Sequence, residues 1–375
     1  IDSSTVVALM QKNSMSAVKT FTIGFNESNY DEAKYARDVA KHLGPNHTEL
    51  YVEPQEAMKV IPSIPSIYCE PFSDSSQIPT SLISKFASKN VKVCLTGDGA
   101  DELFGGYNRY IFINKISSMS KYLPKFITYN LSIILSKLNF KTLKLLSEYI
   151  NKLFFSKNLI QLDNKLQKLG IILKDTSNET KMYLNLVEAF YDKNNPVYEH
   201  LVQDNNFLEN KLDKLQFSKN LNSIEKIMYM DKDMYLTGDI LHKVDRASMY
   251  YSLETRVPFL NSKIIDFSSS LPFELKIKNN KSKYILRELS KKYLPNQISN
   301  RNKMGFSVPL NSWIRDYSDQ FMGNFNNNKE YLVELGFNFS SIIKHFNENK
   351  KETKNWSAYL WNLIIFERWL KKYIL

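Results

Sequence analysis

Residues 91–107 read VKVCLTGDGADELFGGY, and this stretch decides the fold. Its first five residues are a mostly apolar run of strand length, which predicts a buried strand. Gly97, Asp98, Gly99 and Asp101 follow in a turn where a helix would begin. Glycines let a backbone approach a ligand closely, and carboxylates at the carboxyl end of a sheet strand are well placed to hold Mg²⁺ on a phosphate. By spacing alone, a tight turn with solvated acids is an equally good interpretation.

Strands and helices alternate over about the first hundred residues. The patterns at 21–25 and 47–52 predict strands, and apolar residues at helical spacing predict helices over 30–43 and 79–88. Another helix is predicted from residue 2. This alternation favours a parallel sheet covered by helices on both faces, with ligands at the carboxyl ends of the strands.

After residue 107 the chain is helical in period. Residues 110–230 are rich in Lys, Asn and Leu without a visible repeat, and the strongly apolar segment 356–369 predicts a core helix. We therefore predict an α/β nucleotide-binding core over residues 1–107, followed by a large helical part over residues 108–375.

The charge of the chain is uneven. Residues 1–106 hold 9 Lys and Arg against 13 Asp and Glu, whereas the remainder holds 41 against 26, within a net charge of +11. Such an excess can mark a nucleic-acid surface, so a basic nucleic-acid-binding module is one hypothesis. The lysines alternate with Asn, Ser and Leu instead of forming a compact run, which favours solvated helix faces.

Composition bounds the class of protein. Apolar residues make up 43% of the chain, enough for a core, and no apolar run approaches the ~20 residues of a membrane span. The first residues do not show the basic-then-apolar pattern of a signal peptide. Cys69 and Cys94 are too few for a disulfide framework, so a reducing cytoplasm is expected. Both lie among apolar neighbours and are expected to be small core residues. The five histidines make no zinc spacing with a cysteine.

Several segments together resemble the synthetase domain of glutamine-hydrolysing asparagine synthetase, a family within the ATP pyrophosphatases, whose cores are like those of adenine nucleotide alpha hydrolases. In chain order the matching segments are residues 1–4, 21–25, 70–74, 95–107, 243–248, 256–260, 283–288 and 303–306. Residues 110–230 match least. Any one segment would be weak, but their shared order makes the resemblance specific.

The resemblance implies a ligase that uses ATP and Mg²⁺. The side-chain carboxylate of aspartate attacks the α-phosphate of ATP, pyrophosphate leaves, and a β-aspartyl-AMP intermediate forms. Ammonia then displaces AMP to give asparagine. The ammonia would come from glutamine, through an N-terminal glutaminase domain that we expect upstream.

The matching motifs also imply ligands for the nucleotide. Asp2 and Asp101 would hold Mg²⁺ on the pyrophosphate, and Ser3 would donate to the phosphates. Adenosine would be lined largely by backbone groups. The expected ATP-binding residues are Ile1, Asp2, Ser3, Ile23, Thr96 and Gly97.

Two residues match catalytic positions of the family. Asp98 stands where an acid assists the ammonia step, although some members have Glu there and reach one methylene further. Lys283 matches the lysine that stabilises the α-phosphate. Arg246, Glu254 and Arg256 are weaker candidates for substrate contact, because buried ion pairs between helices would explain them equally well.

One departure from the family pattern qualifies these expectations. The family's phosphate loop reads Ser-Gly-Gly-x-Asp-Ser, and the sequence starts at x. We expect the 375 residues to be the back part of a longer chain and to be inactive or barely active alone. The acceptor is open, because β-lactam synthetases, peptide cyclases and polysaccharide-modifying amidotransferases share the adenylation chemistry. A non-catalytic remnant and a homodimer are also left open.

Overall fold

A computed structural model describes residues 1–27, 30–120, 124–138, 221–300 and 308–375, with isolated residues between 142 and 187. The family segment at 303–306 and most of residues 139–220 lie outside the described residues. The chain forms two units. The first contains residues 1–111, 224–308 and 368–375, and the second contains residues 112–223 and 309–367.

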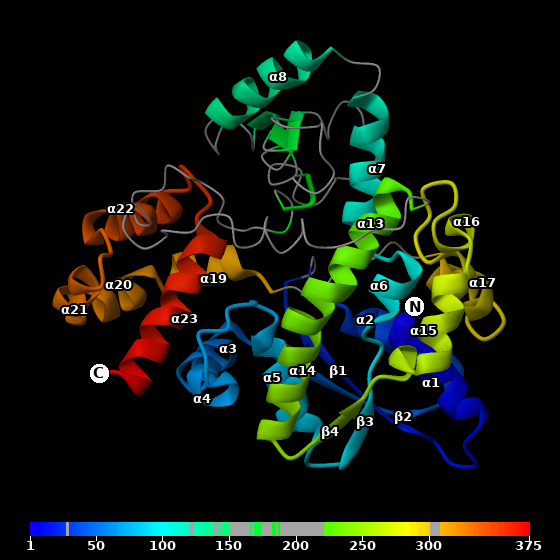
Figure 1. Ribbon diagram of the computed structural model, residues 1–375. Helices are drawn as coiled ribbons and strands as arrows, with labels where there is room; N and C mark the ends of the chain where they lie inside the picture. Colours follow the sequence, from blue (N-terminus) through cyan, green and yellow to red (C-terminus); the bar gives the residue numbers. More distant parts are fainter. Residues whose placement is uncertain are drawn as a thin grey trace. The chain divides into compact units, whose positions relative to one another are not determined.

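The first unit contains a βαβ arrangement near its start. Strand β1 (Lys19–Phe25) pairs in parallel with β2 (Asn46–Val52), with Lys19 opposite Asn46 and Phe25 opposite Val52. Helix α2 (Ala33–Leu43) connects them and ends at Gly44, whose φ of 71° is left-handed, as a helix stop requires. Figure 1 shows β1 and β2 side by side in blue. Both strands and this helix were predicted from sequence and are confirmed.

The second parallel pair joins distant parts of the chain. Strand β3 (Val93–Leu95) pairs with β4 (Glu254–Arg256), so residue 254 and those after it return to the α/β core. The prediction of a buried strand here is wrong in one respect, because Val93 is 43% exposed and Leu95 is 38% exposed. Both side chains line a cavity that also reaches β1, and this accounts for their exposure.

Helices cover these strands and fill the rest of the first unit. Its N-terminal helices are α1 (Asp2–Lys12), α3 (Pro54–Val60), η1 (Ile61–Ser63), α4 (Ile64–Tyr68), α5 (Gln77–Ala87) and α6 (Ala100–Phe104). The later ones are α13 (Ser223–Met230), η2 (Asp231–Leu241), α14 (His242–Tyr250), η3 (Pro258–Leu260), α15 (Ser262–Ser270), α16 (Phe273–Lys276), α17 (Tyr284–Ser290) and α18 (Asn296–Ser299). The predicted helices from residue 2 and over 79–88 are confirmed.

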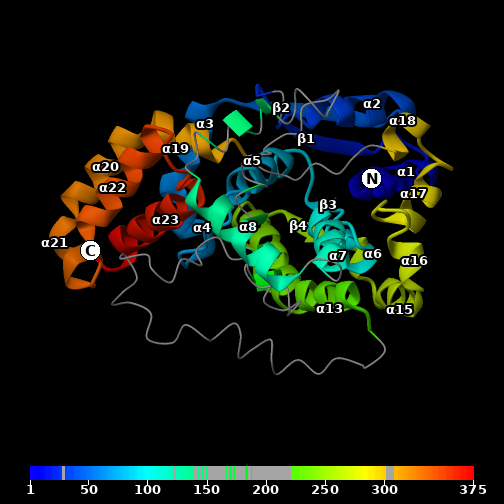
Figure 2. The same ribbon diagram turned by 90° about the horizontal axis from the view of Figure 1, so that it is seen from above.

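One apolar cluster holds the start of the chain to its later helices. Val6 of α1 packs with Leu103 and Phe104 of α6, Phe259 of η3 and Leu286 of α17. Figure 2 shows α15 to α18 gathered on the side of the unit where α1 lies. This packing brings the segment around residue 283 to the N-terminal end of α1.

The second unit is helical in its described part. It contains α8 (Lys125–Lys137), α19 (Leu310–Asp316), α20 (Ser318–Asn327), α21 (Lys329–Glu334) and α22 (Phe339–Lys350). Helices α7 (Asn108–Ser120) and α23 (Ser357–Tyr373) each run from one unit into the other. The predicted apolar helix at the end is confirmed, because Leu360, Trp361 and Ile364 are buried.

The fold class predicted from sequence, an α/β core with a large helical part, is confirmed. The organisation along the chain differs from a single change at residue 107, because residues 224–308 belong to the first unit. The expectation of a buried Cys69 is wrong: it ends α4 with a left-handed φ of 62° and is exposed. Among the described residues, no helix combines the length and apolarity needed to cross a membrane.

Candidate active site

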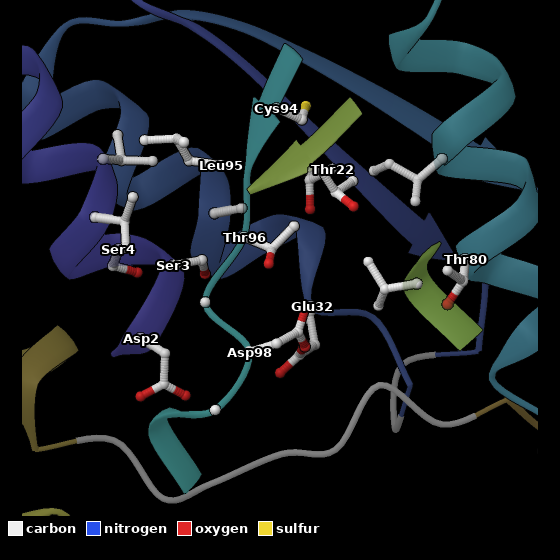
Figure 3. A pocket seen from close by; sticks show the side chains of 18 of the residues that line it. Asp2, Ser3, Ser4, Thr22, Glu32, Thr80, Cys94, Leu95, Thr96 and Asp98 are labelled. Atoms are coloured by element: carbon white, nitrogen blue, oxygen red, sulfur yellow. The ribbon is translucent and has the colours of Figure 1, made fainter. Parts of the chain in front are cut away.

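The first unit contains a cavity of about 1010 Å³ beside the turn that follows β3. Residues along α1, the first half of β1 and all of β3 line it together with residues of α2, α5, η2, α14 and α17. Figure 3 shows Asp2 and Ser3 beside the turn that carries Thr96 and Asp98. Most of the residues predicted as a site meet here, namely Ile1, Asp2, Ser3, Thr96, Gly97, Asp98, Asp101 and Lys283.

Gly97 allows the start of the chain to touch the turn. A Cβ atom placed on Gly97 would lie 2.7 Å from the backbone nitrogen of Ser3 and 3.0 Å from Cβ of Asp2. No side chain fits at that separation, so the close approach requires glycine. The two segments predicted to bind the nucleotide are therefore in direct contact.

Lys283 lies between two aspartates at one end of the cavity. Its ammonium group forms ion pairs with Oδ2 of Asp2 and with Oδ1 of Asp101, the latter at 2.6 Å. Burial opposes the charged form of Lys283, but the negative charges of Asp2 and Asp101 outweigh it and raise its pKa above the ordinary value. Gly106 completes the arrangement, because a Cβ there would collide with Asp101 and Lys283.

The charged side chains at this end of the cavity suit a magnesium-bound triphosphate. Oδ1 of Asp2 is a buried acceptor that makes no hydrogen bond to any described residue. Mg²⁺ is typically bound by one or two carboxylates together with phosphate oxygens and water. Within the described ranges no group of three or more His, Cys, Asp or Glu residues could hold a metal alone. Two aspartates beside a lysine therefore fit a cation delivered with its phosphates.

Asp98 lies in the turn after β3 and lines the cavity. Burial raises the pKa of its carboxyl group, and the negative charges of Asp101 and Asp2 add to this effect. The Thr96 hydroxyl and the charge of Lys243 act in the opposite direction. Asp98 is thus within electrostatic range of Lys243 and of the two aspartates that pair with Lys283.

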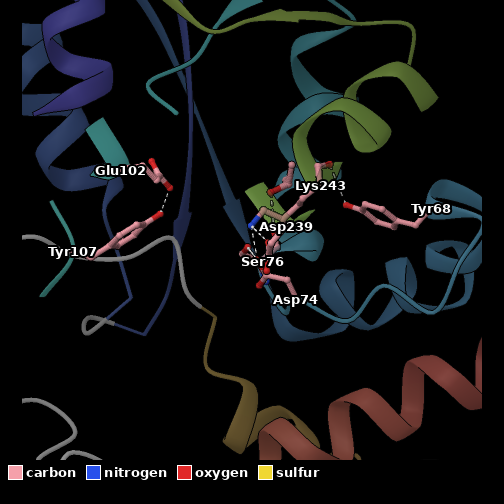
Figure 4. Close-up of polar contacts among 8 residues, drawn as sticks. Tyr68, Asp74, Ser76, Glu102, Tyr107, Asp239 and Lys243 are labelled. Atoms are coloured by element: carbon pink, nitrogen blue, oxygen red, sulfur yellow. Dashed lines mark hydrogen bonds and ion pairs between the residues drawn. The ribbon is translucent and has the colours of Figure 1, made fainter. Parts of the chain in front are cut away.

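Glu102 and Tyr107 form a buried pair on the same wall. The Tyr107 hydroxyl donates to Oε1 of Glu102 at 2.5 Å, and Glu102 is only 1% exposed (Figure 4). Burial raises the pKa of Glu102 to about 7. Tyr107 also stacks on the guanidinium of Arg109, which is paired bidentately with the buried Asp231 at the start of η2.

A second charged cluster was not predicted from sequence. The Lys243 ammonium binds Oδ2 of Asp74 and lies 3.3 Å from Oδ1 of Asp239 (Figure 4). Lys243 and Asp74 line the cavity. Both occur in segments that match the family, at 243–248 and 70–74, but their separation of 169 positions hides the contact in the sequence.

Four predicted site residues do not line the cavity. Ile23 is buried in β1, and its neighbour Thr22 faces the cavity instead. Arg256 pairs with Glu254 at 2.7 Å within β4, and the two side chains are 64% and 53% exposed. Arg246 is exposed on α14. The alternative of buried ion pairs is therefore wrong for Glu254 and Arg256, which form a surface pair.

The fold defines an α/β protein with a charged cavity at the ends of its strands. The chain belongs to the asparagine synthase family, whose sequence pattern matches residues 1–371.

Individual relatives agree with this assignment. The chain is 28% identical to asparagine synthetase (glutamine-hydrolyzing) 1 of Bacillus subtilis over 98% of its length and 54% of that protein. It is 27% identical to a putative asparagine synthetase of Mycobacterium bovis over 98% of its length and 53% of that protein. A putative asparagine synthetase 2 of Methanocaldococcus jannaschii is 40% identical over 34% of the chain and 24% of its own length. The chain thus spans about half the length of the first two relatives.

Proposed function

We propose that this chain carries the synthetase activity of an asparagine synthetase, an ATP-dependent ligase that amidates L-aspartate through β-aspartyl-AMP. Family membership supports the reaction class. The observation that carries the proposal is the placement of Lys283 between Asp2 and Asp101, in the cavity that also contains Asp98. The names of two relatives of this chain describe them as glutamine-hydrolyzing, so glutamine is the proposed source of the ammonia.

The phosphate end of the site would be formed by α1 and the turn after β3. The first N–H groups of α1 receive no side-chain cap, so they can donate to phosphate oxygens beside Ser3. Asp2 and Asp101 would hold Mg²⁺, which neutralises phosphate charge when bound. Lys283 would direct its ammonium at the α-phosphate, where negative charge develops as pyrophosphate leaves.

The two steps place different demands on the protein. In the first, an oxygen of the aspartate side chain bonds to the α-phosphorus and the bond to pyrophosphate breaks. In the second, ammonia bonds to the activated carbonyl carbon, AMP leaves with its electron pair, and the nitrogen loses a proton. Asp98 would accept this proton, because a buried carboxylate with a raised pKa is a stronger base than a solvated one.

Pyrophosphate exchange tests the proposal. Protein produced from the complete gene, supplied with ATP, Mg²⁺ and L-aspartate, should exchange labelled pyrophosphate into ATP. With ammonium added, mass spectrometry should detect asparagine and AMP in equal amounts. Exchange driven by another carboxylate, with none from aspartate, would instead support an acceptor of the β-lactam synthetase, peptide cyclase or polysaccharide-modifying kind.

A further inference from the structure

The cavity contains a second cationic centre that the adenylation chemistry at Lys283 leaves unexplained. Lys243 is only 6% exposed, and its ammonium lies between the carboxylates of Asp74 and Asp239. Burial disfavours the charged form of Lys243, but these two acids outweigh it and raise its pKa. The centre therefore presents one fixed positive charge beside two carboxylates.

The Asp74 carboxylate is held in place before any ligand arrives. Ser76 donates its backbone N–H to Oδ1 and its hydroxyl to Oδ2, both at 2.9 Å. Asp74 and Asp239 keep 19% and 27% of their side chains exposed. The Asp74 carboxylate is thus oriented, and both carboxylates retain surface for a further partner.

The segment that carries Asp239 is unusual. Residues Asp231–Leu241 form η2, a π-helix, and such segments are rare and often occur at functional sites. The Arg109–Asp231 ion pair fixes its first turn, and Tyr235 and Ile240 of this segment line the cavity. Asp239 and Lys243 are four residues apart, across the junction with α14. The junction between η2 and α14 therefore brings the Asp239 carboxylate and the Lys243 ammonium together.

Asp98 is within electrostatic range of both cationic centres. Its carboxyl group is influenced by Lys243 and by Asp101 and Asp2, the partners of Lys283. Lys283, Asp98 and Lys243 line one cavity, so a substrate whose reacting carboxylate is at Lys283 would extend from there toward Lys243. The part of the substrate that reaches Lys243 is then the end opposite the reacting carboxylate.

We propose that Lys243, Asp74 and Asp239 form the subsite for the head group of the α-amino acid substrate. The α-carboxylate pairs with Lys243, and the α-ammonium binds the two aspartates. This inference rests on the proposed function and names the residues that select an amino acid over other carboxylates. It gives a role to Asp74 and Lys243, which lie in the matching segments 70–74 and 243–248 and to which no role was assigned from sequence.

Substrate analogues with matched variants test the subsite. β-Alanine is aspartate without its α-carboxylate, and succinate is aspartate without its α-ammonium. We expect Lys243→Met to lower kcat/KM for aspartate-dependent pyrophosphate exchange by about 100-fold and to change the value for β-alanine little, since a buried charge pair is lost. Asp74→Asn should reduce the preference for aspartate over succinate. The KM for ATP should stay within about twofold in both variants, because the phosphate end is unchanged.

Lys276→Met is the control, because Lys276 is also 6% exposed but does not line the cavity. Lys276→Met should preserve the preference for aspartate over β-alanine and over succinate. Circular dichroism should show all three variants folded. Equal losses for aspartate and β-alanine in Lys243→Met would overturn the inference and leave Lys243 a structural residue. A wild-type protein without aspartate-dependent exchange would overturn the proposed function itself, which is a distinct result.

Discussion

Replacing Gly97 by alanine tests the contact that builds the nucleotide site. The backbone of Gly97 is not left-handed, so alanine can adopt its conformation and any cost comes from contact alone. The new methyl group would lie 2.7 Å from the Ser3 nitrogen and 3.1 Å from the Asp2 carbonyl carbon, which are backbone atoms that cannot rotate away. Overpacking of this kind costs about 1–3 kcal/mol, and the start of α1 must shift to relieve it.

The functional cost should exceed the cost in stability. A shift of α1 moves Asp2 and its N-terminal N–H groups, and misplacement by about 1 Å can lower a rate by about 100-fold. Urea denaturation gives the free energy of unfolding, and pyrophosphate exchange gives the activity. Gly323→Ala is the control, because Gly323 lies inside α20 with nothing within 4 Å of a new Cβ. It should stabilise the protein by up to about 1 kcal/mol. If Gly97→Ala kept full exchange activity and stability, the close contact between the turn and α1 would be refuted.

Two further predictions concern buried charges. The pKa of Glu102 is raised from 4.5 to about 7, so its contribution to stability is present at low pH and is lost as the pH rises through about 7. That shift corresponds to about 3 kcal/mol, so the unfolding free energy of Glu102→Gln relative to wild type should rise by about 2 kcal/mol between about pH 5 and pH 8. Urea titrations at the two pH values measure it, and a pH-independent difference would contradict the buried state of Glu102. Lys283→Met should lower pyrophosphate exchange by about 100- to 1,000-fold, because the charge directed at the α-phosphate is lost. Lys291→Met removes an exposed lysine paired with Glu288 and should leave exchange unchanged; equal losses in both variants would argue against a specific role for Lys283.

Local sequence signals predicted the elements of the first unit well. The run at 21–25 and the Gly44 stop depend on neighbouring residues, so β1 and α2 could be predicted from sequence alone. The exposure of β3 depends on the cavity beside it, which no local pattern encodes. The same holds for Cys69, whose apolar neighbours in sequence do not surround it in the fold.

Contacts between distant residues set the limit of prediction at the site. Lys283 and Asp2 are 281 residues apart, and only the family resemblance placed them together. Lys243 and Asp74 lie in matching segments, but their pairing depends on how α14 packs on α5 and on the π-helical turn before it. The exposed Glu254–Arg256 pair shows the converse, because a matching motif does not fix whether a side chain faces the cavity or solvent.

The position of Lys283 has a consequence for how ligands enter. Its ammonium group is covalently held beside the two carboxylates, so it competes with other cations for them at high local concentration. A divalent cation that binds Asp2 and Asp101 must first displace it, which weakens the affinity for the free ion. A polyphosphate offers the displaced ammonium a new anionic partner. Its binding therefore lowers the free-energy cost of separating Lys283 from Asp2 and Asp101, and binding of the cation does the same for the polyphosphate. By linkage, metal and nucleotide should each strengthen the binding of the other, and a resident lysine would then make the site selective for the two together.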